Sequence, residues 1–197
     1  LLRVKCRNCN KEISIQYLIV ELLTALFFLI EYFYYGLTFT TAFLFILTLG
    51  LIIIFFIDLK HFIIPDVVTF PLMIIGFIKS FDPNLNEIFP NYINSLIGGC
   101  FGYGIIWGII FFYKKFKNKE GMGLGDAKLL AVVGFWFGLE SIPFVIFLSS
   151  VIALLVVLPD LIKKTKKMST QIPFGPYIII GNLIYLLFED KLKFFAI

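Results

Sequence analysis

Seven runs of apolar residues divide the chain, and most are near the roughly 20 residues that a helix needs to cross the hydrocarbon of a bilayer. The runs cover residues 17–35, 39–57, 66–81, 92–113, 127–139, 142–159 and 173–188. Because 60% of the side chains are hydrophobic, well above the share in soluble domains, lipid must solvate most of the chain. The pattern predicts an all-α polytopic membrane protein with about seven transmembrane helices, of which the fifth is the shortest.

The distribution of basic residues predicts the orientation of these helices. Of the 17 lysines and arginines, 14 fall in the N-terminal segment and in the second, fourth and sixth connections, which all lie on one side. By the positive-inside rule, the N-terminus is expected in the cytoplasm and the C-terminus outside. The basic clusters are expected to contact anionic lipid. Nucleic-acid binding is not expected, because these clusters alternate with apolar runs and do not line one polar face.

Four carboxylates lie in or beside the apolar runs, where an ionisable group is costly and usually functional: Glu21, Glu31, Asp58 and Asp126. Asp58 closes the second run and Asp126 opens the fifth, so both are predicted at cytoplasmic helix ends. Glu31 lies near the outer end and is assigned no role. Two carboxylates from distant parts of the sequence can therefore meet at one depth.

Paired carboxyl groups have a specific chemistry. Repulsion between them raises one pKa, so that one group stays protonated while the other is ionised. The ionised group can take a proton from water that attacks a peptide carbonyl, and the protonated group can donate to the oxyanion or the leaving amine. A proton- or cation-coupled transporter would also use intramembrane acids, but we find no convincing internal repeat. A non-catalytic membrane scaffold is a third alternative.

Three glycines precede Asp126 in the stretch Gly121-Met122-Gly123-Leu124-Gly125-Asp126. Glycine permits unusual backbone conformations and lets an extended peptide approach the main chain closely. The same letters are also typical of a flexible turn that caps the following helix. Both interpretations stay open at this point.

Three segments, "IDLKHFIIPD", "EGMGLGDAKLLA" and "IPFGPYIIIG", together resemble the bacterial type IV prepilin peptidases, membrane aspartic proteases of the Gly-x-Gly-Asp class. The N-terminal "KCRNCNKEISIQYLIVELLTA" resembles the end of the family's cytoplasmic cysteine-containing loop and the span after it, so the resemblance covers nearly the whole chain. It implies that Asp58 and Asp126 are catalytic. It also implies prepilin and pseudopilin substrates, whose short basic leader is cut after a glycine on the cytoplasmic side of the bacterial inner membrane, without a cofactor.

The N-terminus departs from the family pattern. The family usually has an additional N-terminal span and a loop with two Cys-x-x-Cys pairs that bind zinc, whereas here only Cys6 and Cys9 are present and match the second pair. Residues 1–16 are expected to be a remnant of this loop and residues 17–197 the peptidase domain. A structural zinc ion is normally bound by four ligands, so a site with two cysteines is incomplete. Many bacterial members also N-methylate the new amino terminus with S-adenosylmethionine. A trimmed chain and a peptidase-only form both fit these observations.

Several other residues are candidates for supporting roles. Asp66 is expected to N-cap the third helix. Lys128 is expected either to snorkel to the interface or to stabilise the ionised carboxylate of Asp126. Glu21 is expected to accept hydrogen bonds from a substrate amine or to make a structural contact, and His61 to be solvated at the interface.

Two prolines and a glycine open the last run, in the order Pro173, Gly175 and Pro176. Proline cannot donate a backbone hydrogen bond, and irregular backbone at membrane depth is tolerated where it lines a cavity or is packed in protein. We interpret this segment as a wall of the substrate site, with a capped helix start as the alternative.

Overall fold

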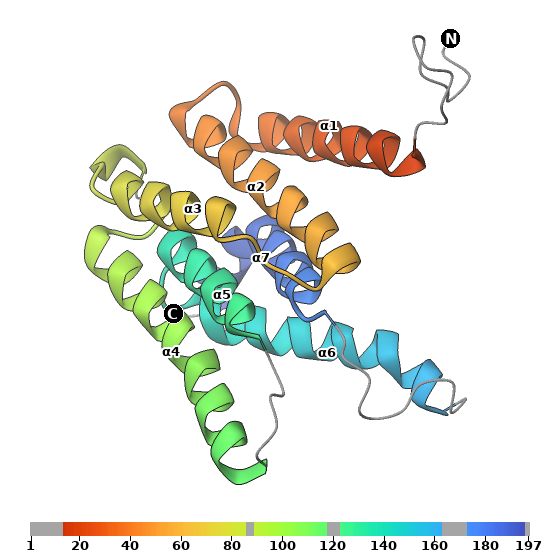
Figure 1. The fold of residues 1–197 in the computed structure, drawn as a ribbon. Coiled ribbons are helices and arrows are strands. Elements are labelled where there is room, and N and C mark those ends of the chain that lie inside the picture. Colours follow the sequence, from red (N-terminus) through yellow and green to blue (C-terminus); the bar gives the residue numbers. More distant parts are fainter. Residues whose placement is uncertain (1–13, 86–88, 118–122, 163–172, 196–197) are drawn as a thin grey trace. The chain divides into compact units, whose positions relative to one another are not determined.

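The chain folds into helices in the computed structural model, which describes residues 14–85, 89–117, 123–162 and 173–195. The helices are α1 (Ile15–Tyr35), α2 (Phe39–His61), α3 (Asp66–Lys79), α4 (Tyr92–Lys117), α5 (Leu124–Phe137), α6 (Ser141–Ile162) and α7 (Gly175–Phe195), with a 3-10 turn at Pro83–Leu85. No strand occurs in these ranges. Each helix overlaps one predicted apolar run, so the all-α prediction is confirmed (Figure 1).

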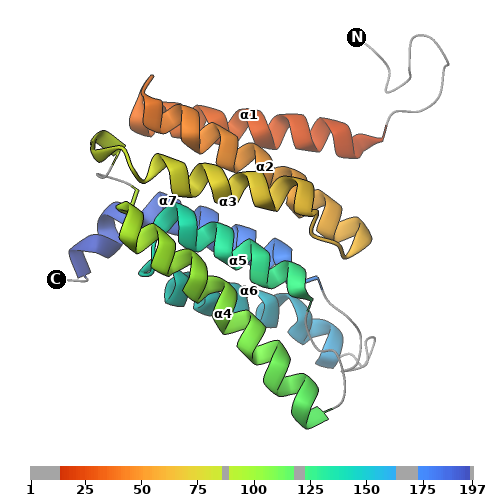
Figure 2. The ribbon, with the colours of Figure 1, turned by 60° about the vertical axis from the view of Figure 1, so that its left-hand side comes forward.

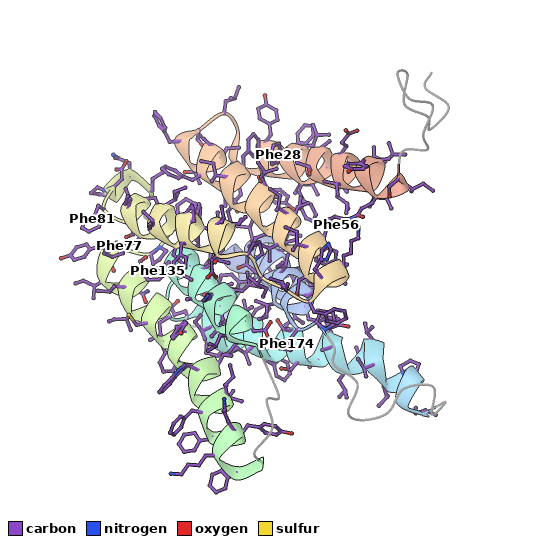
Figure 3. All side chains as sticks on the ribbon, in the orientation of Figure 1. Phe28, Phe56, Phe77, Phe81, Phe135 and Phe174 are labelled. Atoms are coloured by element: carbon purple, nitrogen blue, oxygen red, sulfur yellow. The ribbon has the colours of Figure 1, made fainter. Side chains whose placement is uncertain are left out.

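Four helices in the described ranges are long and apolar enough to cross a membrane: α1, α2, α4 over Tyr92–Phe116, and α6 over Ser141–Pro159. Large apolar side chains such as Leu26, Phe111 and Phe147 are exposed on these helices, and side chains surround the ribbon in Figure 3. Such exposure is expected where lipid is the solvent. The chain is a multi-pass membrane protein, and its orientation stays a prediction.

The chain divides into two compact units, residues 1–52 and residues 53–197. In the first unit, α1 meets the first part of α2 through stacked rings of Phe28 and Phe45, whose centroids are 4.1 Å apart. Glu31, which the sequence left without a role, is buried there and accepts a hydrogen bond from the Thr48 hydroxyl. A buried carboxylate thus helps to join these two helical segments.

In the second unit, α5 contacts α3, α4, α6 and α7, and ten of its 14 residues are buried. Figures 1 and 2 both show α5 beside α4. A methyl group added at Gly98 of α4 would lie 2.7 Å from the carbonyl oxygen of Gly134 on α5, and one at Gly102 would lie 2.7 Å from that of Leu130. The two backbones are therefore in direct contact, which only glycine permits at these positions.

The C-terminal end of α5 lies inside the protein, where side chains from α3 and α4 satisfy its backbone groups. The Lys79 amine donates to the Trp136 carbonyl at 3.0 Å, and the Ser95 hydroxyl donates to the Phe135 carbonyl at 2.7 Å. The Lys79 amine also lies 3.5 Å from the centroid of the Phe89 ring. The rings of Phe77 and Phe135 pack edge to face beside this end (Figure 3). A 14-residue helix of about 21 Å thus ends among side chains of the protein.

Candidate active site

Asp58 lies in the last turn of α2, and its side chain is 4% exposed. Its Oδ2 atom is buried and has no hydrogen-bond partner among the residues that the structure describes. The backbone N–H of Gly175, the first residue of α7, approaches this carboxylate. A methyl group added at Gly175 would lie 2.5 Å from Oδ2, so the start of α7 is in close contact with the acid.

Asp126 lies in the first turn of α5, and its side chain is 8% exposed. Gly123 is the N-cap residue, and its backbone N–H donates to the Asp126 carboxylate. This arrangement resembles a capping box, in which the side chain of the third helical residue reaches back to the N-cap amide. The Gly-x-Gly-Asp motif therefore does begin a helix, but the cap is Gly123 and not the aspartate.

The two carboxylates share one electrostatic environment. Burial, followed by the negative charge of Asp58, raises the pKa of Asp126 to about 7, while the Gly123 N–H acts in the opposite direction. Asp126 precedes the predicted span 127–139 and lies outside the four helices long enough to cross the membrane. The structure thus brings together the two acids that the sequence paired. Asp126 is therefore expected to exchange its proton near neutral pH.

The connection between α2 and α3 brings one further side chain into this site. Ile64 is 9% exposed and lies against the backbones of Gly125 and Gly175. The sequence did not predict this position, because nothing in the residues around Ile64 indicates which distant residues it contacts. Gly125 is therefore required for the close approach of Ile64, since a methyl group there would lie 2.9 Å from the Ile64 Cβ.

The predicted N-cap role of Asp66 is wrong, whereas the snorkelling of Lys128 stays a prediction. Pro65 is the N-cap of α3, and Asp66 is already the first helical residue. The Asp66 carboxylate accepts instead from the Lys128 amine at 2.6 Å. Lys128 cannot readily turn to Asp126, because residues two apart on a helix do not face each other. This ion pair links the start of α3 to the start of α5.

The remaining candidates are placed as follows. Pro173 is half-buried before α7, and Pro176 is the second residue of that helix, where proline costs no hydrogen bond. His61 is exposed at the end of α2, as expected. Glu21 is exposed on α1 in the first unit. Cys6 and Cys9 lie outside the described residues, and within those residues no three His, Cys, Asp or Glu side chains form a metal-binding group.

Two family models match parts of the chain. The family model of the type IV leader peptidase family matches residues 45–158, and that of the bacterial peptidase A24 N-terminal domain matches residues 1–35. No solved structure matches the chain.

Similar curated proteins carry the name prepilin leader peptidase/N-methyltransferase. The Pseudomonas aeruginosa protein is 36% identical over 188 residues, covering 95% of this chain and 63% of its own length. The Aeromonas hydrophila protein is 36% identical, and the Neisseria gonorrhoeae protein 35%, each over 191 residues, 97% of this chain and 64% of the relative. The chain therefore spans less than two thirds of the length of these relatives. With the family model covering more than half of its residues, the chain belongs to the type IV leader peptidase family.

Proposed function

We propose that this chain is a membrane aspartic endopeptidase that removes the short basic leader of type IV prepilins and type II secretion pseudopilins. Cleavage would take place at the cytoplasmic face of the bacterial inner membrane. The observation that carries the proposal is the pair Asp58 and Asp126, two buried carboxylates from different helices that act on each other. The names of the relatives and the family membership support the substrate class.

The chemistry follows from the pair acting as a unit. The ionised carboxylate takes a proton from a water molecule, and the resulting hydroxide attacks the carbonyl carbon of the scissile peptide bond. The protonated carboxyl donates its proton to the carbonyl oxygen, which gives a neutral gem-diol. Return of a diol proton to a carboxylate, and transfer of a proton to the amine, breaks the C–N bond. We assign neither role to one residue, since the two groups titrate together.

Two features of the site support this reaction. The Oδ2 atom of Asp58 is buried without a protein partner in the described residues, so it is available to bind the water or the shared proton. The backbone of Gly123, in an extended conformation just before α5, carries no side chain that would hinder a peptide. An extended substrate can pair with such a main chain while its scissile bond reaches the acids.

The test is cleavage of a purified prepilin by the purified protein in detergent or liposomes. Asp58→Asn and Asp126→Asn should each abolish cleavage while the protein stays folded and in the membrane. Asp82→Asn is the matched control, because the exposed Asp82 carboxylate accepts hydrogen bonds from Asn84 in the turn after α3 and should tolerate the same change. Normal cleavage by either Asp58→Asn or Asp126→Asn would refute the proposal. Such a result would favour a transporter or a non-catalytic scaffold, although no observation on this protein supports either one.

N-methylation is a second proposed activity, since the names of the relatives include it. Incubation with and without S-adenosylmethionine tests this activity directly, because a methyl group replaces a hydrogen and the product gains the mass of one CH2 unit. Cys6 and Cys9 would supply two of the four thiolates that a structural zinc site needs, and the metal content of the purified protein tests that proposal.

A further inference from the structure

The turn between α2 and α3, residues 62–65, has an unusual backbone. Phe62 adopts a positive φ of 57°, which is uncommon for a residue with a bulky side chain. Its N–H donates to the Asp58 carbonyl at 2.9 Å and so closes the helix that carries Asp58. The side chains of Phe62 and Ile63 are exposed, whereas that of the next residue, Ile64, is buried. The turn thus directs one apolar side chain inward, immediately after a candidate catalytic acid.

The Ile64 side chain fills the space between the starts of two helices. A methyl group added at Gly125, in the first turn of α5, would lie 2.9 Å from Ile64 Cβ and 3.3 Å from Cδ1. A methyl group added at Gly175, the first residue of α7, would lie 3.0 Å from the same Cδ1. Both helix starts therefore rest on one side chain. Gly125 is next to Asp126 in the chain, and Gly175 borders the carboxylate of Asp58.

We propose that Ile64 is a positioning residue, whose side chain sets the separation of the Asp58 and Asp126 carboxylates by spacing the starts of α5 and α7. This inference rests on the proposed peptidase function. The two acids must lie close enough to share a proton and far enough apart to admit a water molecule. Ile64 would act through the two glycine backbones that it contacts, those of Gly125 and Gly175. Core packing alone would make the residue important for stability but not for the protonation of the acids.

Three variants separate these two roles. Ile64→Ala removes the spacer, and Ile64→Val keeps Cβ and its branch. Ile142→Ala is the matched control, since Ile142 is fully buried on α6, a helix that carries neither acid, against Gly102 of α4. Both alanine variants should lower the melting temperature. Only Ile64→Ala should lower kcat, by about 10²-fold for a misplacement near 1 Å, with little change in KM, and Ile64→Val should restore most of the activity.

The pH dependence of kcat gives the sharper readout. If the spacing changes, the mutual repulsion of the acids changes with it, so the two apparent pKa values of the profile should move relative to each other in Ile64→Ala. The profile of Ile142→Ala should match that of the wild type. A folded Ile64→Ala protein with wild-type kcat and an unchanged profile would overturn the positioning role while leaving the peptidase function intact.

A measurement without substrate keeps the two proposals apart. Cysteines replace Asp58 and Asp126 in a chain whose own three cysteines are serines, and bifunctional reagents of graded length join them. We expect Ile64→Ala to change the reagent length that joins the pair most efficiently. The same optimal length in both backgrounds would contradict the spacing role. Failure of the wild-type protein to cleave any prepilin would instead count against the peptidase function.

Discussion

Replacing Gly98 with alanine should push α4 and α5 apart where their backbones touch, by a distance that the structure predicts. The added methyl group would lie 2.6 Å from the carbonyl carbon of Gly138 and 2.7 Å from the carbonyl oxygen of Gly134. Both neighbours are backbone atoms, so no side chain can rotate away. Reaching an ordinary contact of 3.4 Å requires the helices to separate locally by about 0.8 Å. Overpacking of this kind costs about 1–3 kcal/mol.

The same substitution at Gly104 is the control. Gly104 lies on the same helix, but no atom lies within 4 Å of the added methyl group. Both substitutions gain up to about 1 kcal/mol of stability from helix propensity. The difference in stability between the two variants therefore measures the cost of disturbing the contact between α4 and α5. For a difference of about 2 kcal/mol, the melting temperature of Gly98→Ala should be about 4–8 °C below that of Gly104→Ala.

Activity should follow the geometry as well. A displaced α5 carries Asp126 with it, and a shift approaching 1 Å can cost up to about 10²-fold in rate. Cleavage of a prepilin by folded protein, measured beside thermal unfolding in the same detergent, checks both effects. Equal melting temperatures and equal rates for Gly98→Ala and Gly104→Ala would refute the direct contact of the two backbones.

Three further predictions concern charged side chains. Lys79→Met should lower the free energy of unfolding by about 1–3 kcal/mol, because it leaves the buried Trp136 carbonyl without this donor; a melting temperature equal to that of the wild type would contradict this. The Asp66–Lys128 pair is partly exposed, so a double-mutant cycle should give a coupling below about 1 kcal/mol that weakens in high salt, and a larger, salt-independent coupling would contradict it. Because folding raises the pKa of Asp126 from 3.8 to about 7, the folded chain binds the proton more tightly and stability falls as the pH rises through this window. Asp126→Asn removes this loss, so its melting temperature relative to the wild type should be higher at pH 8 than at pH 5; the same difference at both pH values would count against the raised pKa.

The helices could be predicted from the sequence because their signals are local. Apolar runs broken by prolines, glycines and charges placed the starts of α2, α3 and α4 at residues 39, 66 and 92, where the structure has them. The start of α5 was predicted three residues late, since Gly123 and Gly125 flank Leu124 and glycine is a poor helix former. This shift matters, because it places Asp126 inside the first helical turn and not before it.

The contacts of the site could not be predicted in the same way, because they depend on which helix faces meet. The pairing of Asp58 with Asp126 was inferred from charge and depth alone, and their catalytic role stays a prediction. The partner of Lys128 proved to be Asp66, which lies far away in the sequence. Neither the inward direction of Ile64 nor the glycine contact of α4 with α5 has a signal in a single sequence, since each needs a partner from a distant segment.

The capping of α5 by its neighbours has a consequence for how the protein responds to its membrane. The long apolar helices can tilt when the bilayer becomes thinner or thicker. The C-terminal end of the short helix α5 is held in place by hydrogen bonds from Lys79 and Ser95. Its N-terminal end carries Asp126. A change in bilayer thickness should therefore displace α3, α4 and α5 together, and the place of Asp126 among these helices should not depend on the lipid composition.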